Sequence, residues 1–183
     1  RHGWVVSIAY RLNIFGYGNK WTVSVSIYMK YGCIAGSVTT DGFKDWIMLN
    51  SFQWGVGRGV SLPHGAEDTR EGSEPSVSEI VVTKRMEKAS PKLWQDAVGG
   101  DFSTTVTIKF TSTTKDKVES YLEYELTNTG LSGYSVSAGS DDAPQESLSL
   151  NFAKVIWKYG ALDAKTGAKP DVVGWDLTQQ KKA

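Results

Sequence analysis

Residues 76–110, SVSEIVVTKRMEKASPKLWQDAVGGDFSTTVTIKF, contain the one segment of the chain with clear helix boundaries. Ser90 is a candidate N-cap, because its hydroxyl can accept a hydrogen bond from a free backbone N–H of the first turn. Pro91 follows where its missing N–H costs nothing. Gly99 and Gly100 favour the left-handed conformation that often ends a helix. Apolar residues between them form one helical stripe: Leu93, Trp94, Ala97 and Val98. The pattern predicts a short helix from Ser90 to Val98.

Polar and apolar residues alternate on both sides of this helix, which is the period of a β-strand. Alternation continues through most of the chain, and it predicts strands over residues 27–32, 44–54, 77–86, 105–110, 118–127, 133–138, 147–159 and 172–177. Regularly spaced strands with one helix are typical of a small barrel or sandwich. We therefore expect a mainly β fold with one short flanking α-helix.

Length and composition narrow the class of protein. The chain has 183 residues, which favours one domain with a substantial core. Its 20 basic and 20 acidic residues give a formal net charge of zero, so nothing in the charge indicates a nucleic-acid partner. Cys33 is the one cysteine, which excludes an internal disulfide and a multi-cysteine zinc site. The apolar runs are too short for a membrane span, so we expect no membrane insertion.

Two segments differ from the alternating strands. Residues 1–26 are aromatic and interrupted by glycines, and we interpret them as an N-terminal extension outside the main domain, which covers residues 27–183. The apolar piece within the extension is not followed by an Ala-x-Ala cleavage site, so a secretory signal is not expected. Residues 55–75 form a long loop rich in turn residues, and a loop of this length in a compact domain is usually functional or disordered.

The sequence contains no recognisable pattern of catalytic or metal-binding residues. His64 lies in the long loop without the Gly-x-Ser-x-Gly elbow of a hydrolase, and Cys33 has no evident base. The glycine-rich run at residues 55–59 lacks the Lys-Ser/Thr of a P-loop. Three glutamates, Glu119, Glu123 and Glu125, share one strand face and would serve glycoside hydrolysis only if two of them faced a cleft. We expect no catalytic residue, no metal and no cofactor.

The tryptophans leave a binding role open. Trp46, Trp54, Trp94, Trp157 and Trp175 would suit a sugar-binding platform if they lay on one exposed face. Most of them occupy alternating or helix-stripe positions, which favours packing in a core or an interface. A secreted β-sandwich module that binds carbohydrate or another ligand is therefore the alternative to a structural protein that assembles with itself.

Several motifs together resemble the haemolysin-coregulated protein (Hcp) family of type VI secretion systems. The resemblance covers about residues 27–183, and it departs at residues 1–26 and at Cys33, where a polar or acidic residue is expected. Its motifs are a strand with a basic residue, a Ser/Thr-Pro-x-Leu helix start, and a Ser-Leu-x-Phe-Ala-Lys-Val strand. They stand here at residues 76–80, 84–94 and 147–155, with further matches at residues 50–55 and 173–177.

This resemblance implies a compact β-barrel of two packed sheets that is structural rather than enzymatic. Six copies would form a ring, and rings would stack into the inner tube of a contractile injection machine. The implied partners are further copies of the chain, a spike protein at the tube tip, sheath proteins and small effectors carried in the lumen. The protein would be made in the cytoplasm and then secreted by the type VI system.

The long loop and the second strand supply the candidate site residues. A ring needs a head-to-tail interface that closes by rotation, and exposed strand edges and the loop can provide it. We expect the loop to reach a neighbouring copy through Gly55, Arg58, Val60, Leu62 and Glu71. We expect Ser51 and Gln53, at the polar end of the second strand, to face the lumen.

Overall fold

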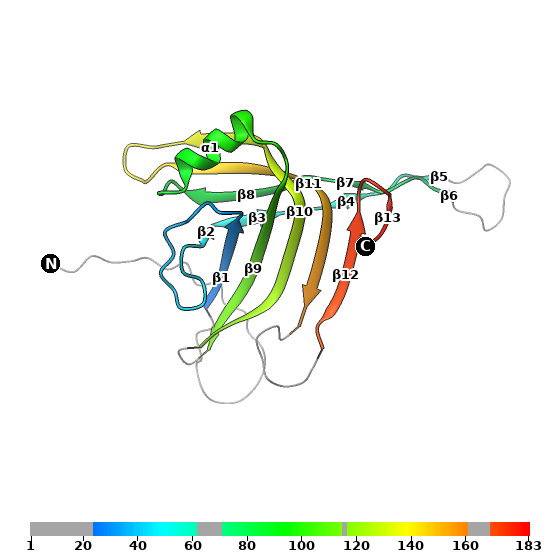
Figure 1. The fold of residues 1–183 in the computed structure, drawn as a ribbon, viewed down its shortest axis with the longest axis horizontal. Helices are drawn as coiled ribbons and strands as arrows, with labels where there is room; N and C mark the ends of the chain where they lie inside the picture. The colour runs from blue at the N-terminus through cyan, green and yellow to red at the C-terminus, as the bar shows by residue number, and fades with distance from the viewer. Residues whose placement is uncertain (1–23, 62–70, 115–116, 161–168) are drawn as a thin grey trace.

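A computed structural model of the chain describes residues 24–61, 71–114, 117–160 and 169–183 (Figure 1). Thirteen strands and one helix occur in these ranges. In chain order they are β1 (Ser24–Tyr31), β2 (Ile47–Leu49), β3 (Ser51–Gln53), β4 (Val56–Gly57), β5 (Val60–Ser61), β6 (Glu71–Gly72), β7 (Ser76–Val77), β8 (Ile80–Arg85), α1 (Ser90–Gly99), β9 (Thr104–Thr114), β10 (Lys117–Ser137), β11 (Gln145–Tyr159), β12 (Asp171–Asp176) and β13 (Lys181–Lys182). The fold is mainly β with one short helix, as the alternation predicts.

Two sheets share the longest strands. The large sheet has the antiparallel order β13-β12-β11-β10-β9-β1-β2. The small sheet has the order β3-β8-β11-β10, and it uses residues 145–150 of β11 and 131–137 of β10. A register shift between Leu131 and Gly133 lies where β10 passes from one sheet to the other, as bulges allow a strand to bend. The two segments expected as separate strands, residues 118–127 and 133–138, are therefore one 21-residue strand.

The segment from β2 to β3 joins the two sheets on their other side. β2 pairs with β1 of the large sheet, and β3 pairs with β8 of the small sheet. Only Asn50 separates them, and its backbone N–H donates to the carbonyl of Thr83 over 2.7 Å. Strand pairing therefore leads from β2 through β1, β9, β10, β11 and β8 to β3, which follows β2 directly in the chain. This arrangement agrees with the barrel that the family resemblance implies.

Changing sheets at Asn50 also changes which side chains point inward. The alternation predicts one strand face carrying Ile47, Leu49, Ser51 and Gln53. Ile47 and Leu49 are buried as expected, but Phe52 is the residue of β3 that packs against the core, whereas Gln53 is exposed. The prediction of one continuous inward face is therefore wrong beyond Asn50. The strand bends there, and the residues that point inward change from odd-numbered to even-numbered positions.

One apolar core lies between the two sheets and under α1. It takes side chains from both sheets and from the helix, including Met29, Ile80, Leu93, Leu126 and Leu148. A second, smaller cluster lies outside it, where Phe43 stacks on Tyr28 of β1 at 4.6 Å between ring centroids. Residues 38–46 thereby cover part of the outer face of β1.

The helix forms where the sequence predicts it, but its ends differ from the prediction. Ala89, not Ser90, is the N-cap, and no side chain caps the helix. The hydroxyl of Ser90 instead accepts a hydrogen bond from the backbone N–H of Glu87 at 2.9 Å. At the other end Gly100 is extended, not left-handed. A side chain at Gly100 would lie 2.6 Å from the carbonyl oxygen of Asp96, so close approach of the backbone is what requires glycine there.

The segment expected as a loop, residues 55–75, is a hairpin over its described part. β4 pairs with β7, and β5 pairs with β6. In Figure 1 this pair of short ladders extends away from the body of the molecule. We call residues 55–61 and 71–78 the arm. Residues 62–70 lie outside the described residues, as do residues 1–23, so the predicted domain boundary at residue 27 stays a prediction.

Candidate assembly surfaces

The arm is held together mainly by its own backbone. Ser73 N–H donates to the carbonyl of Gly59 at 2.8 Å, and Ser78 N–H donates to the carbonyl of Gly55 at 2.9 Å. Arg58 Nε adds a 2.7 Å hydrogen bond to the carbonyl of Ser73. Residues 55–59 are all exposed, and the side chain of Val56 is 67% exposed. The arm therefore presents an apolar side chain and a backbone surface to solvent.

The predicted interface residues fall on this arm as far as the structure describes them. Gly55 and Arg58 are exposed. Val60 and Glu71 belong to the β5–β6 ladder, of whose side chains nothing is described, and Leu62 lies outside the described residues. Their role at an interface stays a prediction.

The outer face of the small sheet is polar but uncharged in its central rows. Cross-strand register aligns Ser51, Thr83, Ser147 and Ser135 in one row, and Gln53, Val81, Ser149 and Gly133 in the next. Ser51 Oγ lies 2.6 Å from Thr83 Oγ1. Ser51 is half-buried and Gln53 is exposed, so only Gln53 of the two predicted lumen residues projects freely.

Two edges of the small sheet lack a partner strand. β3 pairs with β8 on one side only, and residues 132–137 of β10 pair with β11 on one side only, among the residues that the structure describes. Unpaired edges present free N–H and C=O groups and serve as templates for pairing with another chain. The small sheet can therefore be extended at both ends.

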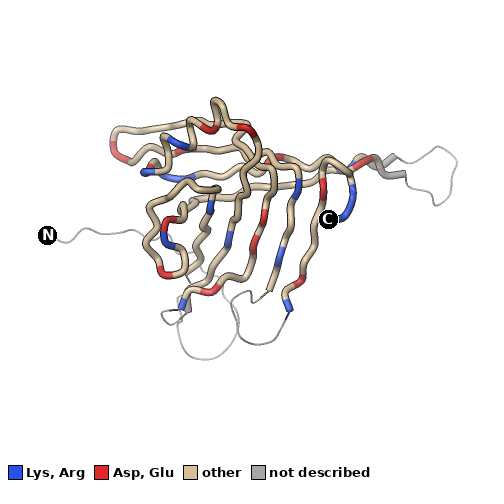
Figure 2. Tube along the Cα trace, viewed as in Figure 1, with Lys and Arg blue, Asp and Glu red and all other residues tan. Residues whose placement is uncertain are grey.

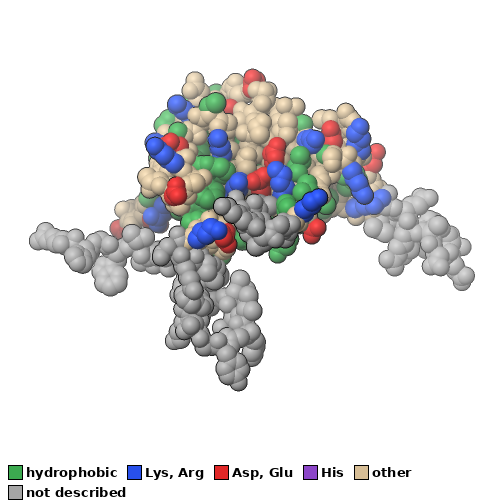
Figure 3. Space-filling model, turned by 60° about the horizontal axis from the view of Figure 1, so that its bottom comes forward, with side chains coloured by type: hydrophobic (Ala, Val, Ile, Leu, Met, Phe, Trp, Pro, Cys, Tyr) green, Lys and Arg blue, Asp and Glu red, His purple; other side chains and the backbone are tan. Residues whose placement is uncertain are grey.

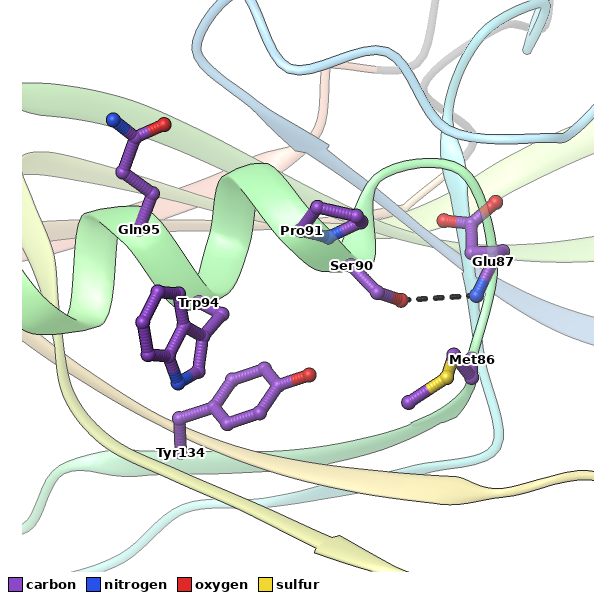
Figure 4. Close-up of a pocket in the computed structure, with 7 residues that line it drawn as sticks. All are labelled: Met86, Glu87, Ser90, Pro91, Trp94, Gln95 and Tyr134. Carbon is purple, nitrogen blue, oxygen red and sulfur yellow. Dashed lines mark hydrogen bonds between the residues drawn. The ribbon is translucent and has the colours of Figure 1, made fainter.

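A groove runs beside α1 and was not predicted. Met86, Pro91, Trp94 and Tyr134 line a cavity of about 550 Å³ between the helix and β10 (Figure 4). The apolar residues of the helix, which were expected to form one stripe, are divided between the core and the solvent. Leu93 is fully buried and Ala97 packs on the core, whereas Trp94 and Val98 are 55% and 69% exposed. The spacing alone could not reveal this division, because adjacent residues lie 100° apart on a helix and only the packing decides which ones face inward.

Below the groove a buried charged network holds the helix in place. Lys84 and Glu146 form an ion pair with both side chains fully buried. Ser90 Oγ donates to Glu146 Oε2 at 2.8 Å and lies 3.0 Å from Lys84 Nζ, which donates to it. The hydroxyl of Tyr134 donates to the other oxygen of Glu146. Burial and then this carboxylate raise the pKa of Tyr134 to about 12. The network joins β8, β10, β11 and the start of α1.

Basic and acidic residues are interspersed along the strands of the large sheet (Figure 2). Glu123 accepts from Lys158 at 2.7 Å and pairs with Lys109 at 3.1 Å, and Lys158 also contacts Glu125 at 2.9 Å. Burial acts to raise the pKa of Glu123, but the hydrogen bonds from the two lysines outweigh it and hold that pKa below its ordinary value. These glutamates are thus neutralised by lysines, and in Figure 3 both charges gather in the middle of the face shown.

Nothing catalytic is found in the described part of the chain. Cys33 is exposed, and both histidines lie outside the described residues. No cluster of three or more His, Cys, Asp or Glu side chains in the described ranges could hold a metal ion. None of the described helices has the length and hydropathy needed to cross a membrane.

Comparison with known proteins identifies the family. Residues 28–159 match the family model described as "Type VI secretion system effector, Hcp". The chain is 30% identical to a protein whose structure is described as that of a type six secretion system protein, with a TM-score of 0.76, over 87% of this chain and 100% of the other. This chain belongs to the Hcp family. A comparison with curated protein sequences finds no significant match.

Other solved structures share the fold. Hcp1 from Salmonella typhimurium is 21% identical with a TM-score of 0.69, over 87% of this chain and 99% of the other. The secreted protein Hcp3 from Pseudomonas aeruginosa is 18% identical with a TM-score of 0.59, over 84% and 98%. Hcp proteins are secreted tube subunits of type VI systems, so this chain is a structural tube protein and not an enzyme.

Proposed function

We propose that this Hcp chain closes into hexameric rings by pairing the two free edges of its small sheet. The observation that carries the proposal is that β3 and residues 132–137 of β10 have no partner strand on one side among the described residues, so that both are edges of one four-stranded sheet. Edge β3 of one copy would pair with the β10 edge of the next. Such a contact is heterologous, and it closes into a ring when the rotation between copies allows it.

The outer face of the small sheet then forms the lumen wall. Ser51 and Gln53 lie on this face in two rows without a charged residue, Ser51 beside Thr83 and Gln53 beside Val81. A wall of short, uncharged polar side chains offers hydrogen bonds without strong electrostatic attraction, which suits the passage of varied small effectors. This chemistry supports the lumen assignment of Gln53 in particular, because its side chain is exposed.

The arm provides the contact between copies beyond the sheet edges. A two-stranded hairpin without further strands is marginally stable in water, so the arm gains stability when another surface covers it. Gly55, Arg58, Val60, Leu62 and Glu71 are the residues that we assign to this contact. Stacked rings would carry a spike protein at the tip, lie inside sheath proteins, and leave the cytoplasm through the type VI machine.

The deciding experiment is negative-stain electron microscopy of the purified protein, with light scattering for its mass. Six-fold rings with an open centre are the expected result. A variant lacking residues 60–71, which joins Gly59 directly to Gly72, should remain folded but lose ring or tube formation. Monomers of the unaltered chain at all concentrations would overturn the ring proposal, and unchanged tubes without residues 60–71 would overturn the arm contact alone.

The ligand-binding alternative has less support. It requires several aromatic side chains on one exposed face. Trp94 on α1 and Trp157 on β11 are 55% and 39% exposed, whereas Trp46, Trp54 and Trp175 pack against the two apolar clusters. Within the described ranges the two exposed tryptophans thus lie on different elements, which does not favour a common platform.

A further inference from the structure

Glycine alternates with larger residues along the first strand of the arm. Gly55, Gly57 and Gly59 take every second position, and Val56 and Arg58 stand between them. Because successive side chains of an extended strand point to opposite faces, one face of this strand has no side chains. The run resembles no phosphate-binding loop, and its glycines need another explanation.

Gly59 has an explanation within the chain. A Cβ at Gly59 would lie 2.9 Å from Ser73 Oγ, the hydroxyl that also accepts a 2.9 Å hydrogen bond from the Gly59 N–H. Ser73 on the opposite strand of the arm thus occupies the space that a side chain at Gly59 would take.

Gly57 has no such explanation. A Cβ at Gly57 would meet no described atom within 4 Å, and its φ lies outside the left-handed region that favours glycine. Glycine in a strand is destabilising relative to alanine because more backbone entropy is lost on folding. A bare position that the isolated chain does not need is expected where another backbone or ring approaches closely.

The groove beside α1 is a surface that could receive such a bare strand. Its apolar lining is exposed, and no described residue covers it. Pro91, Trp94 and Val98 recur at helical spacing on the outer side of α1, and Met86 and Tyr134 face them. In Figure 4 the rings of Trp94 and Tyr134 lie close together at the wall of the groove. An aromatic ring can pack directly on a bare backbone, and glycine leaves the room for it.

We propose that the bare face of β4 at Gly57 packs into the α1 groove of a neighbouring copy, against Trp94. The inference rests on the proposed ring and tube assembly and deepens it. The occupant is a second copy because the chain belongs to a family that assembles into hexameric tubes, and a heterologous contact needs two different surfaces on each copy. The arm is the protruding surface, and the groove is the recessed one.

Two single substitutions test the contact, each with a matched control. Gly57→Val fills the bare face, and Trp94→Ser removes the ring. Gly139→Val is the control for the first, because a Cβ at Gly139 also meets nothing within 4 Å. Val172→Ser is the control for the second, because Val172 is 56% exposed on β12, away from the groove. We expect both test variants to reduce tube yield at least tenfold by light scattering, while both controls assemble like the unaltered chain.

Disulfide trapping tests the pairing directly and does not depend on tube yield. Cys33 is first replaced in a Cys33→Ser background, since it is exposed. Proteins carrying Val56→Cys, which leaves Gly57 bare, or Gln95→Cys, which lines the groove and leaves Trp94 in place, are prepared separately, mixed under assembly conditions and oxidised. A disulfide requires Cα atoms within about 7 Å, so covalent dimers should form in the mixture and not in either protein alone.

The outcomes separate this inference from the proposed function. Dimers in the mixture, with loss of assembly in the two test variants, support it. Rings and tubes that form in both test variants, without dimers in the mixture, overturn the groove contact and leave ring assembly intact. If the unaltered chain forms no rings at all, the proposed assembly and this inference both fail.

Discussion

Lys84 Nζ donates a hydrogen bond to Ser90 Oγ at 3.0 Å, and neither residue reaches solvent appreciably. Lys84 ends the inward face of β8, and Ser90 begins α1. The Ser-Pro start of the helix thus fixes its position through a buried charge on a neighbouring strand, and not by capping its own first turn. Glu146 of β11 completes the network.

Removing one member of this pair should destabilise the fold strongly. Lys84→Met leaves Glu146 buried without its cation, and breaking a buried ion pair in this way costs about 3–5 kcal/mol. Replacing both partners, as Lys84→Met with Glu146→Leu, should restore part of this loss, since no buried charge then remains in this network and the hydroxyls of Ser90 and Tyr134 lose only their hydrogen bonds to Glu146. Urea denaturation measures both variants. A double variant as unstable as the single one would contradict the pairing.

Acid should weaken the fold partly through Glu123. Its folded pKa is lowered, so its ionisation stabilises the fold above the unfolded pKa of about 4.3, and this contribution is lost as pH falls through the folded value. Glu123→Gln should therefore reduce the stability at pH 7 and flatten its decline below about pH 4. Chemical denaturation across pH 2–7, a range that spans the ordinary glutamate pKa of about 4.3, measures this slope.

Glu119→Gln is the matched control for that experiment. Glu119 pairs with Lys117, but its side chain is 41% exposed and that of Lys117 is 66% exposed, and exposed pairs contribute little. An acid profile of Glu123→Gln that equals that of Glu119→Gln would refute a special role for Glu123.

Gly36 is required by the packing of residues 36–46 against each other. A Cβ at Gly36 would lie 2.2 Å from the carbonyl oxygen of Trp46, so Gly36→Ala must move backbone. Overpacking of this kind costs roughly 1–3 kcal/mol, which lowers the melting temperature by about 2–4 °C per kcal/mol in a domain of this size. Gly139→Ala, in open space, should leave it unchanged or slightly higher. Equal melting temperatures of the two variants would be the contrary result.

The lumen assignment of Gln53 predicts size-dependent labelling. In a Cys33→Ser background, Gln53→Cys should react with a small maleimide both in tubes and in dissociated subunits. A maleimide on a large polymer should react slowly in tubes only, because the enclosed wall excludes it. If the polymer reagent labels tubes as fast as dissociated subunits, Gln53 faces the outside.

Much of the fold can be predicted from local patterns. Alternation places β1, β8, β9, β11 and β12 near their observed positions, because long parts of each strand keep one inward face. In β11 the inward face changes from Leu148, Leu150 and Phe152 to Val155. The helix is found from Pro91 and the glycines after it, although Ser90 does not cap it. The family motifs lie on β3, β8, α1, β11 and β12, so the family follows from residues that build the core and the small sheet.

The amino-acid sequence by itself determined the class of fold, the place of the helix and the family, because these depend on periodicity and on short motifs. The tertiary structure alone decided which side of each element is covered. At Asn50 it changed which alternate residues point inward, and it joined two predicted strands into β10. It divided the apolar stripe of the helix, with Leu93 in the core and Trp94 at the groove. It also turned Ser90 towards Lys84. These outcomes depend on residues distant in the chain, which no local pattern contains.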